Sequence, residues 1–228
     1  MSSVAALIPA AGTGRRLGMG FKALVEVGGQ TLLERAVLAL APHVDELVIA
    51  IHPEMRPAVE TLLERFALSH ALTLTEGGDT RQASVRKLLA RSSAEHVLIH
   101  DAARPFLGAR VIGEMLGAVR THGAATVALP CTDTLITSGG AVWEGLLDRS
   151  HTYAIQTPQG GRRDWLSKAH VQAEREGWAA TDDGGLLARA GRAVHLVRGD
   201  ARLFKVTGPA DLDLARAYAA AWDALEKR

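Results

Sequence analysis

The chain has little cysteine, little net charge and no long apolar run. Its 228 residues include one cysteine, Cys131, which excludes an intramolecular disulfide framework and a zinc site built from several cysteines, and which is typical of a reducing cytosol. Lys and Arg number 26 against 25 Asp and Glu, so bulk positive charge gives no reason to expect nucleic-acid binding. No apolar stretch reaches the roughly 18 residues that a membrane span needs. These features predict a cytoplasmic enzyme.

Several familiar catalytic signatures are also missing. The chain has no G-x-S-x-G elbow and no H-E-x-x-H pair, and its nine histidines show no ligand spacing. The glycine turn near the start fails the dinucleotide pattern, because Leu17 occupies the place of the third glycine, and it fails the Walker A pattern too. A dinucleotide-dependent dehydrogenase is therefore disfavoured. Phosphoryl or nucleotidyl transfer, which needs few protein nucleophiles or bases, fits best.

Short apolar runs alternate with longer amphipathic segments, which predicts an α/β fold with a mainly parallel sheet flanked by helices. The first run leads into glycines and has no basic residue before it, so it predicts a buried strand and not a signal peptide. Ligands of such sheets bind beyond the carboxyl ends of the strands. We expect one domain over residues 1–228. The apolar runs are 4–9, 47–51, 72–75, 96–100, 125–129 and 194–197, and the helical patterns include 31–40, 57–68, 82–90, 111–121 and 209–224.

One stretch, at about residues 131–157, breaks this alternation. Two short strand-like pieces, 134–138 and 141–144, flank Gly139 and Gly140 and predict a β-hairpin with a two-residue turn. An isolated hairpin is barely stable in water, so it must pack on something. The residues leave two readings open: a flap on its own domain, or an arm that grips a second subunit.

The glycine turn after the first apolar run is suited to phosphate. Alanine and glycine let a ligand approach the backbone, and exposed N–H groups in such a turn can cradle an anion. Arg15, Arg16 and Lys22 follow its first glycines, and no acidic residue precedes Glu26. Guanidinium and ammonium groups beside exposed amides predict a triphosphate site. The alternative is a surface loop with solvated bases.

A carboxylate follows the fourth apolar run, at the same predicted edge of the sheet. Asp101 is a candidate for Mg²⁺, which takes few protein ligands and completes its shell with phosphate oxygens and water. Arg104 is a candidate for a second anionic group. Asp101 has the alternative of capping a helix. We expect His100 to be a buried histidine with satisfied hydrogen bonds.

The loop after the third apolar run, residues 77–84, combines glycines with a short acid and a hydroxyl. This composition suits recognition of a base or a ribose. Alone it is a weak signal, because Asp79 or Thr80 has the alternative of capping the next helix. The prediction of a base-binding or ribose-binding role is strengthened because this loop lies at the same sheet edge as the other two candidate segments.

These motifs continue in order along almost the whole chain. The segments are 9–16, Lys22, 77–79 with Arg81 and Ser84, 100–105, 148–149, 157–159, 181–182 and 205–207. Together they resemble the 2-C-methyl-D-erythritol 4-phosphate cytidylyltransferases of the non-mevalonate isoprenoid pathway. The resemblance implies a Rossmann-like fold of the nucleotide-diphospho-sugar transferase type, CTP and methylerythritol phosphate as substrates, Mg²⁺ or another divalent cation, and a homodimer joined by a protruding β-arm.

The resemblance also implies roles for individual positions. The residues expected along the triphosphate are Ala10, Ala11, Gly12 and Gly14. Those expected at the cytosine are Gly78, Asp79 and Ser84, with Ala102 near the ribose and Asp101 on Mg²⁺. Those expected to stabilise charge on the α-phosphate are Arg16 and Lys22. Those expected to position methylerythritol phosphate are Thr181, Lys205 and, from the partner subunit of the dimer, Arg149.

The chain departs from the family pattern at two places. Phe21 precedes Lys22 where the family usually has proline, and Ala23-Leu24 replaces its common Gln-Tyr. Gly184 and Gly185, which are poor helix formers, stand where the family starts a helix. Two alternative functions stay open: a ribitol-5-phosphate cytidylyltransferase, which shares the CTP motifs, and a non-catalytic CTP-binding sensor. The retained cations argue against the sensor.

Overall fold

The computed structural model describes residues 2–14, 18, 20–66 and 71–226. The strands are β1 (Val4–Pro9), β2 (Glu26–Val27), β3 (Gln30–Thr31), β4 (Glu46–Ile51), β5 (Ala71–Glu76), β6 (His96–Ile99), β7 (Ala124–Pro130), β8 (Ile136–Thr137), β9 (Gly145–Leu146), β10 (Tyr153–Arg162) and β11 (His195–Arg198). The helices are α1 (Leu32–Leu40), α2 (Arg56–Glu64), α3 (Arg81–Arg91), α4 (Ala109–His122), α5 (Arg163–Glu176), α6 (Asp183–Arg189) and α7 (Pro209–Glu226).

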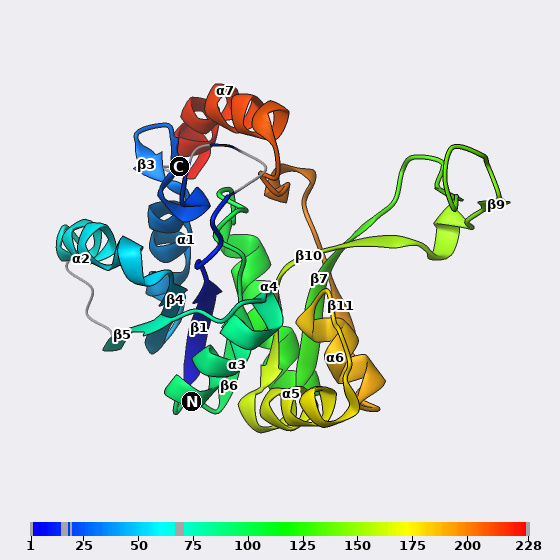
Figure 1. Ribbon diagram of the computed structural model, residues 1–228, viewed down its shortest axis with the longest axis horizontal. Coiled ribbons are helices and arrows are strands. Elements are labelled where there is room, and N and C mark those ends of the chain that lie inside the picture. Colours follow the sequence, from blue (N-terminus) through cyan, green and yellow to red (C-terminus); the bar gives the residue numbers. More distant parts are fainter. Residues whose placement is uncertain (1, 15–17, 19, 67–70, 227–228) are drawn as a thin grey trace.

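A seven-stranded sheet in the order β11-β7-β10-β6-β1-β4-β5 forms the centre of the molecule (Figure 1). The pairs β1–β4, β1–β6, β4–β5 and β7–β11 are parallel, whereas β10 runs antiparallel to both β6 and β7. The sheet is mainly parallel and flanked by helices, which confirms the predicted fold class. None of the helices in the described part of the chain combines the length and apolar character needed to cross a bilayer.

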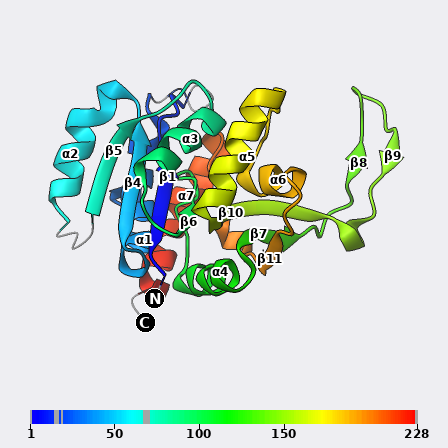
Figure 2. The same cartoon turned by 90° about the horizontal axis from the view of Figure 1, so that it is seen from below.

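Both faces of the sheet are buried, as the near-continuous apolar strands require. Along β1, Ile8 packs into a core with α1, α2 and α4, while the preceding Leu7 packs into a core on the other face with α3, α5 and α6. Alternate side chains of a strand point to opposite faces, so a strand buried on both sides reads as one unbroken apolar run. Figure 2 shows the helices on either side of the sheet.

A third, smaller core anchors the C-terminal segment beside the sheet edge. Phe106, which follows β6, packs against Trp222 of α7 at 5.5 Å between ring centroids. Arg35 of α1 pairs with Asp223 of α7 at 2.8 Å. The Val206 amide donates to the Ala103 carbonyl at 2.8 Å. These contacts hold the segment that carries Lys205 against the loop after β6.

Strand β10 was not predicted, because its sequence contains proline and consecutive glycines. Both glycines are needed for close approach of neighbouring strands. A Cβ on Gly160 would lie 2.2 Å from the Val97 carbonyl oxygen, and one on Gly161 would lie 2.3 Å from that of Gly123. Residues that weaken a strand in isolation are here required by its central position in the sheet.

The segment between β7 and β10 extends away from the body as an arm, which we define as residues 131–152 (Figure 1). The Cys131 amide donates to the Thr152 carbonyl at 3.0 Å and closes its base. The predicted hairpin is present, but the predicted turn is wrong: Thr137 pairs with Gly145, so β8 and β9 enclose the longer loop 138–144. Ser138 Oγ stabilises that loop by donating to the Val142 carbonyl at 2.7 Å.

Candidate active site

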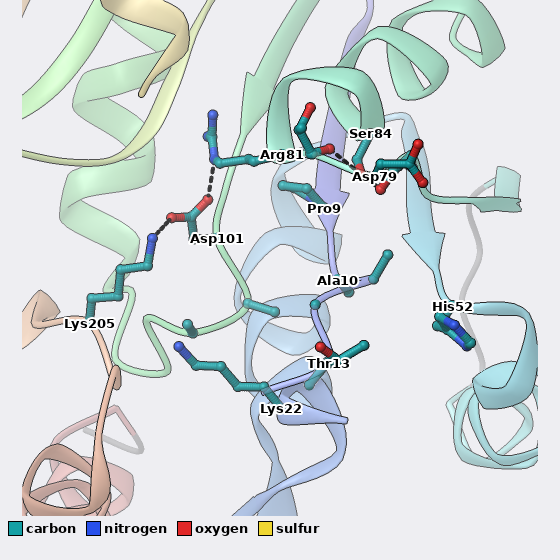
Figure 3. Close-up of a pocket in the computed structure, with 17 residues that line it drawn as sticks. Pro9, Ala10, Thr13, Lys22, His52, Asp79, Arg81, Ser84, Asp101 and Lys205 are labelled. Atoms are coloured by element: carbon teal, nitrogen blue, oxygen red, sulfur yellow. Dashed lines mark hydrogen bonds and ion pairs between the residues drawn. The ribbon is translucent and has the colours of Figure 1, made fainter. Parts of the chain in front are cut away.

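A cleft of about 630 Å³ lies beyond the carboxyl ends of β1, β5 and β6 (Figure 3). Its walls come from the turn after β1, the loop between β5 and α3, and the loop after β6. The residues that line it are Pro9, Ala10, Ala11, Gly12, Thr13, Lys22, Ala23, His52, Gly78, Asp79, Thr80, Arg81, Ser84, Asp101, Ala102, Ala103 and Lys205. The three loops predicted from the sequence therefore meet in one cavity.

The turn after β1 presents small residues to the cleft. The Ala10 amide donates to the Ala50 carbonyl at 2.7 Å, which continues the pairing of β1 with β4. Ala11 and Gly12 follow directly along the cleft wall. A Cβ on Gly77 would lie 2.3 Å from Ala11 Cβ, so glycine there lets the loop after β5 pack against the turn. The backbone at this point is open to close approach by a ligand.

Gly14 shapes the same turn without lining the described cleft. Its φ is +60°, and a Cβ there would lie 2.5 Å from the Gly20 carbonyl oxygen, so both the backbone conformation and the space require glycine. Arg15 and Arg16, which the sequence predicts at the phosphates, lie outside the described residues.

Lys22 reaches the cleft from the segment that follows, where residues Lys22–Leu24 form one turn of 3-10 helix. The ring of the preceding Phe21 lies 4.9 Å from the ring of His52, centroid to centroid. The phenylalanine that departs from the family pattern thus packs this segment against the loop after β4. His52 itself lines the cleft and was not predicted as a site residue.

The loop between β5 and α3 is held by its own hydroxyls. Thr80 Oγ1 accepts from the Ala83 amide at 3.0 Å and caps α3. Ser84 Oγ accepts from the Gly78 amide at 3.0 Å. Of the two residues considered as caps, Thr80 takes that role, which leaves Asp79 on the cleft wall. Gly78, Asp79 and Ser84 are thus brought together, as the base-binding prediction requires.

Asp101 sits between two cations. Its Oδ1 accepts from Arg81 Nε at 2.9 Å, and its Oδ2 lies 2.6 Å from Lys205 Nζ. Burial alone would raise the pKa of Asp101, but Arg81 and Lys205 outweigh burial and hold it well below its usual range. The next helix, α4, begins only at Ala109, so helix capping does not account for Asp101. The carboxylate is ionised and lies at the cleft.

The cleft fits a single-carboxylate Mg²⁺ site. The described residues contain no cluster of three or more metal-ligating side chains. Mg²⁺ does not need one where substrate phosphates and water complete its shell. Asp101 supplies an ionised carboxylate, and the Lys205 side chain that now occupies one of its oxygens is 38% exposed and able to turn away.

His100 and Arg104 have structural partners. His100 is fully buried between the Thr157 hydroxyl, 3.0 Å from Nδ1, and the Arg104 carbonyl, 3.1 Å from Nε2, as predicted for a satisfied histidine. The Arg104 guanidinium donates to the Leu203 carbonyl at 2.7 Å and to the Ile155 carbonyl at 3.3 Å. Arg104 is outside the described cleft lining and ties β10 to the segment before Lys205. Its role in binding an anion stays a prediction.

The family model described as 2-C-methyl-D-erythritol 4-phosphate cytidylyltransferase matches residues 4–221. The chain belongs to this cytidylyltransferase family. A Deinococcus radiodurans protein of that name is 55% identical over 213 residues, which cover 93% of this chain and 88% of the relative. A Thermus thermophilus protein of the same name is 41% identical over 221 residues, covering 97% and 99%.

Solved structures agree with this assignment. The crystal structure of the cytidylyltransferase from Thermus thermophilus matches with a TM-score of 0.81 and 39% identity over 96% of this chain and 98% of that chain. The 4-diphosphocytidyl-2C-methyl-D-erythritol synthase from Anaerococcus prevotii matches with a TM-score of 0.84 and 26% identity over 96% and 99%. The chain is a nucleotidyltransferase of isoprenoid biosynthesis, and the activity predicted from the sequence is confirmed at the level of the family.

Two residues that the cytidylyltransferase resemblance assigns to the acceptor are not brought to the described cleft. Arg149 lies on the arm, where its guanidinium donates to the Thr132 carbonyl at 3.2 Å. Thr181 is exposed beside the start of α6. Among the residues predicted for the acceptor, Lys205 alone lines the cleft of the single chain.

The start of α6 explains the second departure from the cytidylyltransferase pattern. The helix forms despite Gly184 and Gly185, because Asp182 Oδ1 caps the Gly185 amide at 2.6 Å and Gln159 Oε1 accepts from the Asp183 and Gly184 amides. Asp182 is therefore the N-cap of α6. The buried Asp183 was not predicted as a site residue, because the two glycines after it indicate only a poorly formed helix.

Proposed function

We propose that the cleft transfers a cytidylyl group from CTP to 2-C-methyl-D-erythritol 4-phosphate and releases pyrophosphate. The observation that carries this proposal is the meeting of the three predicted loops in one cavity with Lys22 and Lys205. Family membership supports the two substrates. The available volume also suits a nucleotide, since small-molecule sites are typically about 300–1,000 Å³.

The nucleotide half of the site uses backbone more than side chains. In this proposal the triphosphate lies along Ala10, Ala11 and Gly12, where the absence of bulk lets amides face the phosphates. The cytosine lies against the loop that Ser84 Oγ holds to the Gly78 amide, with Asp79 at the edge of the base. Ala102, on the wall beside Asp101, faces the ribose.

In this reaction the protein has to position the substrates and stabilise negative charge. The acceptor phosphate attacks the α-phosphorus, a new phosphorus–oxygen bond forms, and the bond to the bridging oxygen breaks so that pyrophosphate leaves with the electron pair. A phosphate monoester is largely dianionic at neutral pH, with a second pKa of about 6, so its attack needs no general base. Lys22, together with Arg16, offsets charge that grows on the α-phosphate.

Asp101 is proposed to hold Mg²⁺ or another divalent cation. The bound ion would neutralise charge on the phosphate oxygens. Asp101 serves this role because it is already ionised, and Lys205 would turn from it toward the acceptor when the substrates are bound. Lys205 would then lie beside methylerythritol phosphate with Thr181.

We propose that the enzyme is a homodimer joined through the arm, with Arg149 completing the acceptor site of the other subunit. Large apolar side chains on the arm are uncovered by their own chain: Val142 is 73% exposed, Trp143 61% and Leu146 66%. A concentration of exposed apolar groups is typical of a protein–protein interface. A cytoplasmic location belongs to the same proposal, because CTP is available there.

The test is pyrophosphate release in the presence of Mg²⁺, with each of the four nucleoside triphosphates crossed with methylerythritol 4-phosphate and ribitol 5-phosphate. We expect release only with CTP and methylerythritol 4-phosphate. Release with ribitol 5-phosphate instead would overturn the acceptor and keep the nucleotide site. CTP binding without release with either acceptor would favour a sensor.

A further inference from the structure

Four charged side chains form a continuous row from the cleft into the core. Lys205 Nζ lies 2.6 Å from Asp101 Oδ2, Arg81 Nε donates to Asp101 Oδ1 at 2.9 Å, and Arg81 Nη1 lies 2.8 Å from Asp183 Oδ2. The signs alternate along the row, so the formal charges cancel. Figure 3 shows the part of the row that faces the cleft, from Lys205 through Asp101 to Arg81.

Asp183 is the buried end of this row and does not line the described cleft. Its side chain is 1% exposed, and its Oδ1 lies 3.3 Å from His170 Nε2 on α5. Its amide donates to Gln159 Oε1 at 2.7 Å. A buried carboxylate is costly unless it is paired, and the charged partner of Asp183 is Arg81. The preceding Asp182 caps α6, so capping does not explain why Asp183 is there.

The guanidinium of Arg81 is divided between two carboxylates. Nε donates a hydrogen bond to Asp101, and Nη1 forms an ion pair with Asp183 Oδ2 at 2.8 Å. Nη2 and Asp183 Oδ2 are both buried, and neither has a partner with hydrogen-bond geometry among the described residues. Nε and Nη2 lie on the same edge of a guanidinium and are able to grip one carboxylate through two bonds. Without Asp183, Arg81 is free to turn that edge fully onto Asp101.

We propose that Asp183 is a positioning residue for cytidylyl transfer: by holding Arg81 Nη1, it limits Arg81 to one bond with Asp101 and leaves Asp101 Oδ2 available at the cleft. In this structure Lys205 occupies that oxygen. With the substrates bound, Asp101 would hold the divalent cation. The inference rests on the role proposed above for Asp101. It adds Asp183, a buried residue that acts on Asp101 through Arg81.

The test compares Asp183→Asn with Asp182→Asn in the full-length protein. Both variants remove one negative charge at the start of α6, where Asp182 is the N-cap and Asp183 the first helical residue. Of the two, Asp183 pairs with Arg81. The measurement is Mn²⁺ binding, detected by electron paramagnetic resonance with CTP present and the acceptor left out. Because no turnover occurs without the acceptor, this signal reports on Asp101 alone. We expect Asp183→Asn to weaken Mn²⁺ binding by about 10- to 100-fold, the usual effect of losing a group that orients a metal ligand. Asp182→Asn should bind Mn²⁺ as the wild type does.

Steady-state kinetics provide a second readout. Asp183→Asn should lower kcat and raise the Mg²⁺ concentration needed for half-maximal rate, with the KM for methylerythritol 4-phosphate unchanged. Circular dichroism checks that the variant is folded. Should it fail to fold, Arg81→Lys decides instead, because lysine keeps the charge but lacks the two-sided fork that bridges the carboxylates. It should show the same loss of Mn²⁺ affinity.

The inference would be overturned if folded Asp183→Asn bound Mn²⁺ with wild-type affinity. If Asp183→Asn does not fold, wild-type affinity in Arg81→Lys would overturn it. An equal loss of Mn²⁺ affinity in Asp182→Asn would overturn it as well. Asp101→Asn separates this inference from the proposed function. Loss of Mn²⁺ binding in Asp101→Asn with normal binding in Asp183→Asn refutes the positioning role alone. Normal binding in Asp101→Asn refutes the metal assignment itself, and with it the inference.

Discussion

The cleft and the arm are built in opposite ways. The cleft holds a carboxylate whose charge is paired inside the chain, since Asp101 lies between Arg81 and Lys205. The arm is bound to itself by short-range contacts, such as Ser138 Oγ with the Val142 carbonyl, and exposes its apolar side chains. One chain therefore brings the residues of the nucleotide site together, whereas in our proposal the arm is covered only when a second subunit is present. The two regions should respond separately to mutation.

The largest effect should come from the cleft. Lys22→Ala should lower kcat by about a hundredfold or more, because a positioned cation opposite developing phosphate charge is lost. Arg16→Met should do the same by resemblance to the family. Pyrophosphate release measures the rate, and circular dichroism checks the fold. Lys168→Ala is the matched control, since Lys168 is 75% exposed on α5 and pairs with Asp164 at the surface. Near-normal turnover in folded Lys22→Ala would refute its assignment.

The next effect tests whether the arm completes the site of another subunit. Arg149→Ala should raise the KM for methylerythritol 4-phosphate and lower the rate, with CTP binding unchanged. Co-refolding it in equal amounts with Lys22→Ala should restore about a quarter of the wild-type activity, since half of the dimers are mixed and each mixed dimer has one intact site. No recovery on mixing would mean that Arg149 acts on the cleft of its own chain or on none.

A smaller effect is expected when the arm loses apolar surface. Trp143→Asp should weaken self-association by about 2 kcal/mol or more, the usual contribution of a buried interface tryptophan. The urea unfolding of the body should be unchanged. Sedimentation velocity measures the association. Val171→Asp is the control, because Val171 is 62% exposed on α5, away from the arm. An equal loss of association in both variants would contradict an interface centred on the arm.

A pH response of stability should come from the body and not from the arm. Burial lowers the pKa of His100 to about 4 from its ordinary 6.5. The unfolded chain protonates this histidine below pH 6.5, whereas the folded chain does so only near pH 4. The contribution of neutral His100 to the free energy of unfolding is therefore fully present above pH 6.5. It should fall by up to about 1.4 kcal/mol per pH unit between these values. Urea unfolding from pH 7 to 4 measures the slope, which His100→Gln should flatten and His151→Gln, on the arm, should not. Equal slopes in the wild type and His100→Gln would contradict the assignment.

The sequence was informative where local patterns decide the structure. Runs such as residues 47–51 predicted parallel strands, because a strand buried on both faces is apolar throughout. Since the carboxyl ends of parallel strands share one edge, the positions of Ala11, Asp79 and Asp101 beside one another followed without coordinates. The cleft was therefore predictable from the residues that follow three apolar runs.

The sequence was less informative where distant segments determine the structure. β10 was missed because Gly160 and Gly161 are explained only by the strands on either side of them. The turn of the arm was misplaced because two adjacent glycines resemble a tight turn. Asp183 was overlooked because its partner Arg81 is 102 positions away in the sequence and no local spacing links them.

Strand β10 also restricts where residues can be inserted into this chain or removed from it. Tyr153 pairs with Pro130 at the base of the arm, and further along Thr157 contacts His100 and Gln159 holds the start of α6. Inserting one residue before Thr157 would turn the side chains that follow to the opposite face of the sheet. The exposed loop 138–144 lies beyond this pairing and is not bound by the register of the sheet. The sheet therefore fixes the length of the strand that supports the arm and leaves the length of the arm itself unconstrained.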